Sequence, residues 1–211
     1  CNFANPAITG RVFLLLSFGG DMTTWVKPFF YRGRSFFEMF AATGNLPDGV
    51  TGATPLASGD AGLLDLFLGN VGGSLGETSA LALLIGGVFL LVLGLISWHT
   101  PVAYLGGLAV FYTLATGGEM TDVLYALLSG GVILGAFFMA TDYVTTPMTG
   151  AGKLIFGLGC AVLTFVIREF ANMPEGCSFS ILLMNLLTPY IDKLTMTHPF
   201  GAKPAVKKEA K

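Results

Sequence analysis

The residues "ALALLIGGVFLLVLGLIS", Ala80–Ser97, contain no charged side chain over 18 positions. Two further runs, Pro101–Gly118 and Val123–Thr141, are also uncharged and are 18 and 19 residues long. An α-helix needs about 20 mainly apolar residues to cross the hydrocarbon core of a bilayer. We therefore expect each of the three runs to form a transmembrane helix.

The composition of the whole chain is typical of a membrane protein. Hydrophobic residues make up 53% of the 211 positions, charged residues 11%, and the mean hydropathy is +0.72. Two shorter apolar segments, Leu154–Ile167 and Gly176–Ile191, are closed by charged side chains; Lys153 and Arg168 at the ends of the first can snorkel to the membrane surface. The chain is predicted to be an all-α membrane protein, a polytopic bundle of about five transmembrane helices plus a partial N-terminal helix.

Charge and chain order divide the sequence into four predicted regions. Residues 1–20 are the end of a truncated transmembrane helix, 21–78 an extracytoplasmic loop, 79–195 the five-helix bundle and 196–211 a Lys-rich tail. The tail "KPAVKKEAK" holds four lysines and one glutamate, which favours the cytoplasmic side of a bacterial inner membrane. Because the chain starts with Cys and has no initiator Met, we expect it to be part of a longer protein.

Glycine is frequent, with 29 residues, and Gly86–Gly87, Gly106–Gly107 and Gly130–Gly131 lie inside the apolar runs. Small residues let membrane helices approach closely, so we expect a compact bundle. Glycines of this kind would also suit helices that are loosened around a cofactor or a pore.

The predicted loop contains the polar stretch "DGVTGAT", Asp48–Thr54. Pro47, Gly49 and Gly52 favour a turn, which would present the Thr54 hydroxyl to solvent. From these residues alone, a plain loop that only satisfies local hydrogen bonds is an equal alternative.

This stretch resembles the Asp-x-x-[Ser/Thr]-Gly-Ala-Thr sequence at which flavin transferases join the phosphate of FMN to the last threonine as a phosphoester. The resemblance makes Thr54 the acceptor, with an attachment motif formed by Asp48, Thr51, Gly52 and Ala53. Four other stretches are similar to the membrane subunit shared by the Rnf complex (its D subunit) and the Na⁺-translocating NADH:quinone reductase (its B subunit): "NPAITGR", "GETSALALLIGG", "GAFFMATDYVTTPM" and "MPEGCSFSILLMNLLTPYID".

The short connection "GGEMTD" between the second and third apolar runs favours the Rnf D subunit, because the quinone reductase subunit usually has a longer connection there. Tyr143 stands where the family pattern would have proline, which leaves the geometry of that turn open. The resemblance implies half of an inverted-repeat fold. It also implies a subunit that is catalytic only within its complex, an ion-translocating ferredoxin:NAD⁺ oxidoreductase.

The resemblance implies two flavins: covalent FMN and a noncovalent one, riboflavin, between the helices. Thr141 and Asp142 are candidates for the second flavin or for an ion site, and a helix-end role is the alternative for them. The implied partners are the other Rnf subunits, a flavin transferase during maturation and the lipid bilayer. Nucleic acid is not expected, since the basic tail suits lipid headgroups.

For several other residues the sequence does not decide between a functional and a structural role. Acidic side chains at the span ends, Glu77 and Asp192, could bind an ion or make helix-end contacts. Phe137 and Phe138 could flank an electron path or simply pack. The cysteines and histidines, namely Cys1, Cys160, Cys177, His99 and His198, are too scattered to predict a metal site or a disulfide. Two rival classes lack flavin altogether: a small-solute channel or carrier, and an unmodified scaffold subunit.

Overall fold

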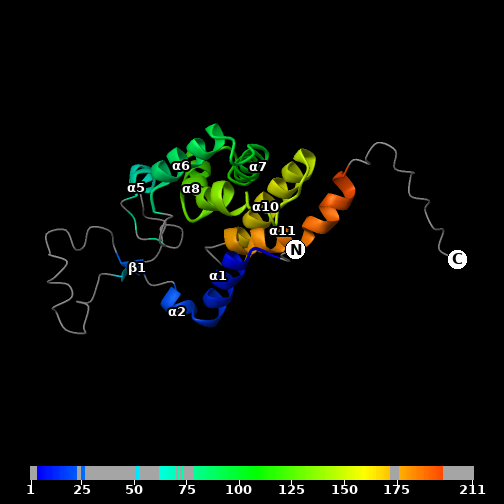
Figure 1. Cartoon of the computed structure of the whole chain (residues 1–211). Coiled ribbons are helices and arrows are strands. Elements are labelled where there is room, and N and C mark those ends of the chain that lie inside the picture. Colours follow the sequence, from blue (N-terminus) through cyan, green and yellow to red (C-terminus); the bar gives the residue numbers. More distant parts are fainter. Residues whose placement is uncertain are drawn as a thin grey trace, which may run out of the picture.

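The computed structural model describes residues 4–22, 25–26, 51–52, 62–69, 71, 73, 78–171 and 176–196. These residues are helical except for two short strands and the connections (Figure 1). The helices are α1 (Pro6–Ser17), α2 (Gly19–Met22), α5 (Leu63–Leu68), α6 (Ala80–Val92), α7 (His99–Ala115), α8 (Met120–Leu128), α9 (Val132–Leu134), α10 (Gly150–Phe170) and α11 (Gly176–Thr195). A π-helix, η1 (Gly135–Met139), follows α9, and strands β1 (Trp25–Val26) and β2 (Thr51–Gly52) pair antiparallel. The prediction of an all-α chain is confirmed.

Local chemistry sets where the first two predicted spans begin and end. Ser79 caps the N-terminus of α6 by accepting a hydrogen bond from the Ala82 amide at 3.3 Å. The helix ends at Val92, five residues earlier than predicted from Ala80–Ser97, because Gly94 takes a left-handed φ of +69°. α7 likewise stops at Ala115, ahead of Gly117 and Gly118 with φ of +73° and +98°.

The third predicted span is not one continuous helix. α8 ends at Leu128, α9 begins at Val132, and the helical segments on the two sides of the break meet at 65°. Ser129 is extended and Gly130 has a φ of +66°, so the backbone leaves the helical region at two successive residues. The expectation of an unbroken helix over Val123–Thr141 is therefore wrong.

Helix length bears on the number of spans. Among the described residues, α10 with its 21 residues is long and apolar enough to cross a membrane by itself. The bent pair Met120–Leu128 and Val132–Met139 makes a second if it is counted as one span. α1 and α6 are apolar but shorter. The count of about five spans, and the division of the chain into four regions, stay predictions.

The centre of the bundle is a close contact between α7 and α10. A Cβ atom on Gly157 would lie 2.8 Å from both the Ala103 Cβ and the Thr100 carbonyl oxygen. A Cβ on Gly107 would lie 2.9 Å from the Ala161 Cβ. Each helix thus contributes two small residues four positions apart, and such pairs let backbones touch. Because residues 103 and 107 face 157 and 161 in the same order, the two helices run parallel.

α11 packs against α10 in the opposite direction. A Cβ on Gly152 would meet the Thr195 hydroxyl at 3.0 Å, and one on Gly159 would meet the Met184 Cε at 2.4 Å. The predicted role of glycine in close packing therefore holds at several positions. It fails for Gly106, whose Cβ would meet nothing within 4 Å, and for Gly130, which forms the break.

Replacing Gly157 by Ala should destabilise the bundle by about 1–3 kcal/mol, because backbone atoms of α7 would have to move away from the new methyl group. Gly106→Ala is the matched control: it adds the same group to open space on α7 and should be neutral or slightly stabilising. Thermal unfolding of both purified variants in detergent measures the difference. Equal melting temperatures would contradict this account of the α7–α10 contact.

Candidate functional site

Of the flavin-attachment motif predicted from the sequence, the structure describes only Thr51 and Gly52. These two residues form β2, with Gly52 opposite Trp25 and Thr51 opposite Val26. They are therefore extended, and the prediction of a turn is wrong at Gly52, because backbone pairing with β1 replaces it. Asp48, Ala53 and Thr54 lie outside the described residues. So does the candidate ion ligand Glu77.

Asp142 joins the connection after η1 to the start of α1. Its Oδ2 accepts a hydrogen bond from the Asn5 Nδ2 at 3.3 Å and another from the Thr145 hydroxyl at 3.0 Å. Asn5 is the N-cap of α1, and its Oδ1 accepts from the Ala7 amide at 2.9 Å. The carboxylate thus lies beside the positive end of a helix dipole, which stabilises its charge. This geometry supports the helix-end role that was left open for Asp142.

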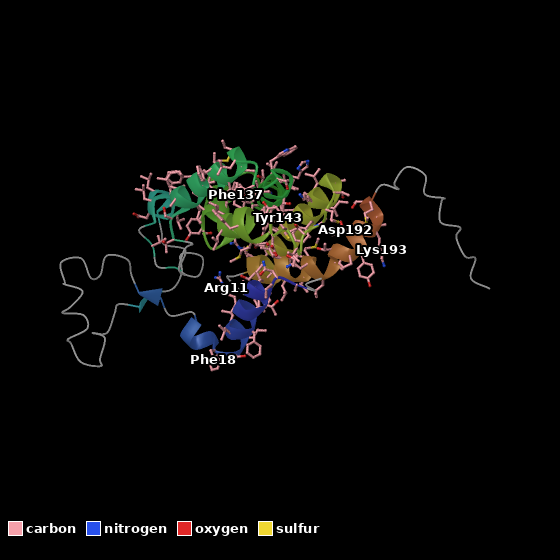
Figure 2. The ribbon with its side chains drawn as sticks, viewed as in Figure 1. Arg11, Phe18, Phe137, Tyr143, Asp192 and Lys193 are labelled. Atoms are coloured by element: carbon pink, nitrogen blue, oxygen red, sulfur yellow. The ribbon has the colours of Figure 1, made fainter. Side chains whose placement is uncertain are left out.

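Thr141, the other candidate for a second flavin, makes a local bond. Its hydroxyl donates to the Phe137 carbonyl at 2.6 Å, one turn back along the chain. Phe137 itself is 7% exposed, and a Cβ on Gly87 of α6 would lie 2.6 Å from its ring. In Figure 2 this residue lies within the bundle, so Phe137 packs between helices. Of its neighbour Phe138, 39% is exposed.

Tyr143, which follows "ATD", contacts the connection between α6 and α7. Its hydroxyl donates to the carbonyl of Leu95, in the connection between α6 and α7. At the C-terminal end of α11 (Figure 2), the Oδ1 of Asp192 accepts a bond from the Met148 amide at 3.1 Å. Asp192 therefore supports the connection before α10, in keeping with a helix-end role.

A buried group of hydroxyls joins three helices. The Tyr104 hydroxyl lies 2.7 Å from that of Thr164, which lies 2.7 Å from the Ser180 hydroxyl. Tyr104 also donates to the Cys177 sulfur at 3.2 Å, and all four side chains are at most 4% exposed. This cluster, from α7, α10 and α11, was missed in the sequence. The spacing of isolated polar residues within apolar runs does not reveal that they face one another.

Asn185 on α11 is buried without such pairing. It is 2% exposed, yet neither its amide nitrogen nor its amide oxygen has a hydrogen-bond partner among the described residues. A buried polar group without a partner costs about 1–3 kcal/mol. Such a group marks a position where a further polar partner would be stabilising.

Arg168, one of the two basic residues that can snorkel at the ends of the Leu154–Ile167 segment, binds backbone carbonyl groups. Its Nη1 donates to the Ala126 carbonyl at 2.7 Å and its Nη2 to the Ser129 carbonyl at 3.1 Å. The guanidinium is directed at the end of α8 because carbonyls without intrahelical donors lie there.

Among the described residues there is no group of three or more His, Cys, Asp or Glu side chains that could hold a metal ion.

Comparison with known proteins identifies the family. The model of the NQR2, RnfD, RnfE family matches residues 1–201. The chain belongs to this family. It is 46% identical over its whole length to the D subunit of the Na(+)-translocating ferredoxin:NAD(+) oxidoreductase complex of Acetobacterium woodii. It is also 40% identical to two other D subunits, over 95% and 96% of the chain. They belong to the ion-translocating oxidoreductase complex of Stutzerimonas stutzeri and the proton-translocating ferredoxin:NAD(+) oxidoreductase complex of Clostridium ljungdahlii.

These matches confirm the resemblance to Rnf D subunits that the sequence motifs predicted. The chain spans 62–64% of the length of these three relatives. The helical architecture, with one described helix long and apolar enough to cross a membrane, is in keeping with membership of the NQR2, RnfD, RnfE family.

Asp142→Ala should lower stability by about 1.5–3 kcal/mol, because it removes a charged acceptor from both Asn5 and Thr145. Thr141→Val is the matched neighbour, since it removes only the local bond to Phe137 and should cost less than about 1 kcal/mol. Thermal unfolding gives the stabilities, and protease sensitivity near residue 5 reports whether α1 has detached. A larger loss of stability in Thr141→Val than in Asp142→Ala would contradict this account of the two contacts.

Proposed function

We propose that this chain is part of the D subunit of an ion-translocating ferredoxin:NAD⁺ oxidoreductase and that it carries electrons through a covalently attached FMN. The observation that supports this most directly is "DGVTGAT" at Asp48–Thr54, in a chain 46% identical to a protein named as such a D subunit. A seven-residue pattern with four fixed positions has little chance of arising by accident in a chain of this length.

In this proposal Thr54 holds the cofactor, with its hydroxyl oxygen forming the phosphoester. FMN, when bound, supplies the redox chemistry, and the protein supplies attachment, distance and electrostatics. Asp48 would orient the modifying enzyme. Gly52 and Ala53 are small and would let that enzyme approach the backbone closely. The pairing of β2 with β1 would steady the segment that leads to Thr54.

The orientation follows from the basic tail. Lysines next to the last helix favour a cytoplasmic C-terminus, and an odd number of spans then puts the loop with Thr54 outside the inner membrane. A covalent bond matters at that face, because a dissociated flavin would be lost by dilution. The proposed partners are the other Rnf subunits, and a flavin transferase during maturation.

A second, noncovalent flavin also belongs to the proposal. Thr141 and Asp142 are engaged in bonds within the chain, whereas Asn185 has an unpaired donor and acceptor among the described residues. An amide of this kind matches the alternating donors and acceptors at the edge of an isoalloxazine ring. Because Asn185 is enclosed, a flavin would reach it only if the surrounding side chains moved.

Thr54→Val should abolish covalent flavin, because it removes the hydroxyl at almost constant shape. Thr54→Ser is the matched control, since it keeps an oxygen that can form a phosphoester and should retain some flavin. In-gel fluorescence of the denatured full-length protein under ultraviolet light measures both. Fluorescent Thr54→Val protein would disprove the attachment site, and a dark wild-type band would favour the channel or scaffold alternatives.

Membranes that carry Thr54→Val should also lose most ferredoxin-dependent NAD⁺ reduction while the complex still assembles. The reason is that an electron carrier needs a neighbouring carrier within short reach, and removing one interrupts the path. Activity is measured with the amount of assembled complex on the same membranes, and Thr54→Ser again serves as the control. Near-normal activity at normal assembly would show that electrons bypass this flavin.

A further inference from the structure

The break between α8 and α9 leaves backbone carbonyl groups at the C-terminal end of α8 without partners from the helix. The last carbonyls of any helix lack intrahelical donors. In an apolar environment each unpaired carbonyl is costly, since water does not replace the missing donor. The same end carries the negative pole of the helix dipole. A hydrogen-bond donor, preferably one that carries a positive charge, would therefore stabilise this end of α8.

Arg168 of α10 supplies positively charged hydrogen-bond donors at this place. Its two terminal nitrogens bind separate carbonyls, those of Ala126 at 2.7 Å and Ser129 at 3.1 Å. Ala126 is 5% exposed and Ser129 is fully buried, whereas Arg168 is half-buried, so both bonds are partly shielded from the surroundings. Charge-assisted hydrogen bonds are roughly twice as strong as neutral ones, and the planar guanidinium suits two acceptors at once.

α11 provides a second contact with the break. The sulfur of Cys177 donates to the Gly131 carbonyl at 3.5 Å, and a Cβ atom on Gly135 would lie within van der Waals overlap of the same sulfur. A thiol is a weak donor. Arg168 is therefore the stronger of the two attachments, and Cys177 fills the space next to the first residue of η1.

We propose that Arg168 is a positioning residue whose guanidinium takes the place of a bound cation at the end of a discontinuous helix and thereby fixes the 65° bend. In transporters, the carbonyls at such helix ends coordinate Na⁺ or H⁺. Here a side chain of the same chain occupies them. The bend sets the direction in which η1 leaves the break, and with it the positions of Phe137 and Asp142.

The bend can be measured by the distance between two nitroxide labels in the full-length protein in lipid nanodiscs. Suitable sites are Met120 at the start of α8, 69% exposed, and Phe138 in η1. Eighteen residues of straight helix would separate them by about 27 Å, and a 65° bend shortens this to about 23 Å. Cys1→Ser removes one native thiol, and the two buried cysteines can remain.

Arg168→Met should shift the mean distance by up to about 4 Å, or spread it across that range, because the α8 carbonyls lose their donors. Arg168→Lys keeps the charge and should restore at least half of the shift. Lys153→Met, at the other end of α10, is the matched control and should leave the distance unchanged. An unchanged distance in Arg168→Met would overturn the proposal.

Hydrogen exchange distinguishes loss of the bend from loss of the fold. In Arg168→Met, amides of residues 129–135 should exchange at least about tenfold faster, while peptides of α7 and the first half of α10 keep their protection. If all these peptides lose protection equally, Arg168 stabilises the whole bundle and has no specific positioning role, which also overturns the proposal. Neither readout depends on a bound flavin, so the result is independent of the proposed function.

Discussion

The contact between α7 and α10 is possible only because the two backbones touch. Thr100, Ala103 and Gly107 on one helix face Gly157 and Ala161 on the other at distances that leave no room for larger side chains. In a bilayer, lipid tails are as apolar as leucine, so helices associate through close packing and hydrogen bonds more than through burial from water. The buried hydroxyl cluster forms because the same approach brings side chains of α7 and α10 within bonding distance.

Parallel packing of α7 and α10 also constrains what lies between them in the sequence. The chain must return across the bundle through α8, α9 and η1, and it does so with a break and a π-helix. Both features leave backbone carbonyl groups without the amide donors that a continuous α-helix would provide. The protein pairs several of them with side chains: Arg168 at the end of α8, Cys177 at Gly131 and Thr141 at Phe137. Irregular backbone within the bundle is thus accompanied by donors from neighbouring elements.

Hydropathy and charge alone predicted the helical class and the approximate position of every long helix from α6 to α11, but helix ends were less predictable. Gly94 ends α6 early, whereas Gly106 lies within α7, because a glycine breaks a helix only where the backbone takes a left-handed φ. Short linear motifs predicted the family, which the family match confirms, whereas the role of Thr54 stays a prediction. Contacts such as that of Asn5 with Asp142 have no local pattern, because they follow from how the helices pack.

The bond between Asn5 and Asp142 has a consequence for the order of synthesis. The two residues are 137 positions apart. At about 5–20 residues per second, α1 would leave the ribosome roughly 7–27 s before its acidic partner. During that interval Asn5 lacks this hydrogen-bond partner, and α11, which also contacts α1, is synthesised later still. Docking of α1 is therefore expected to be a late step of assembly, completed only after η1 has formed.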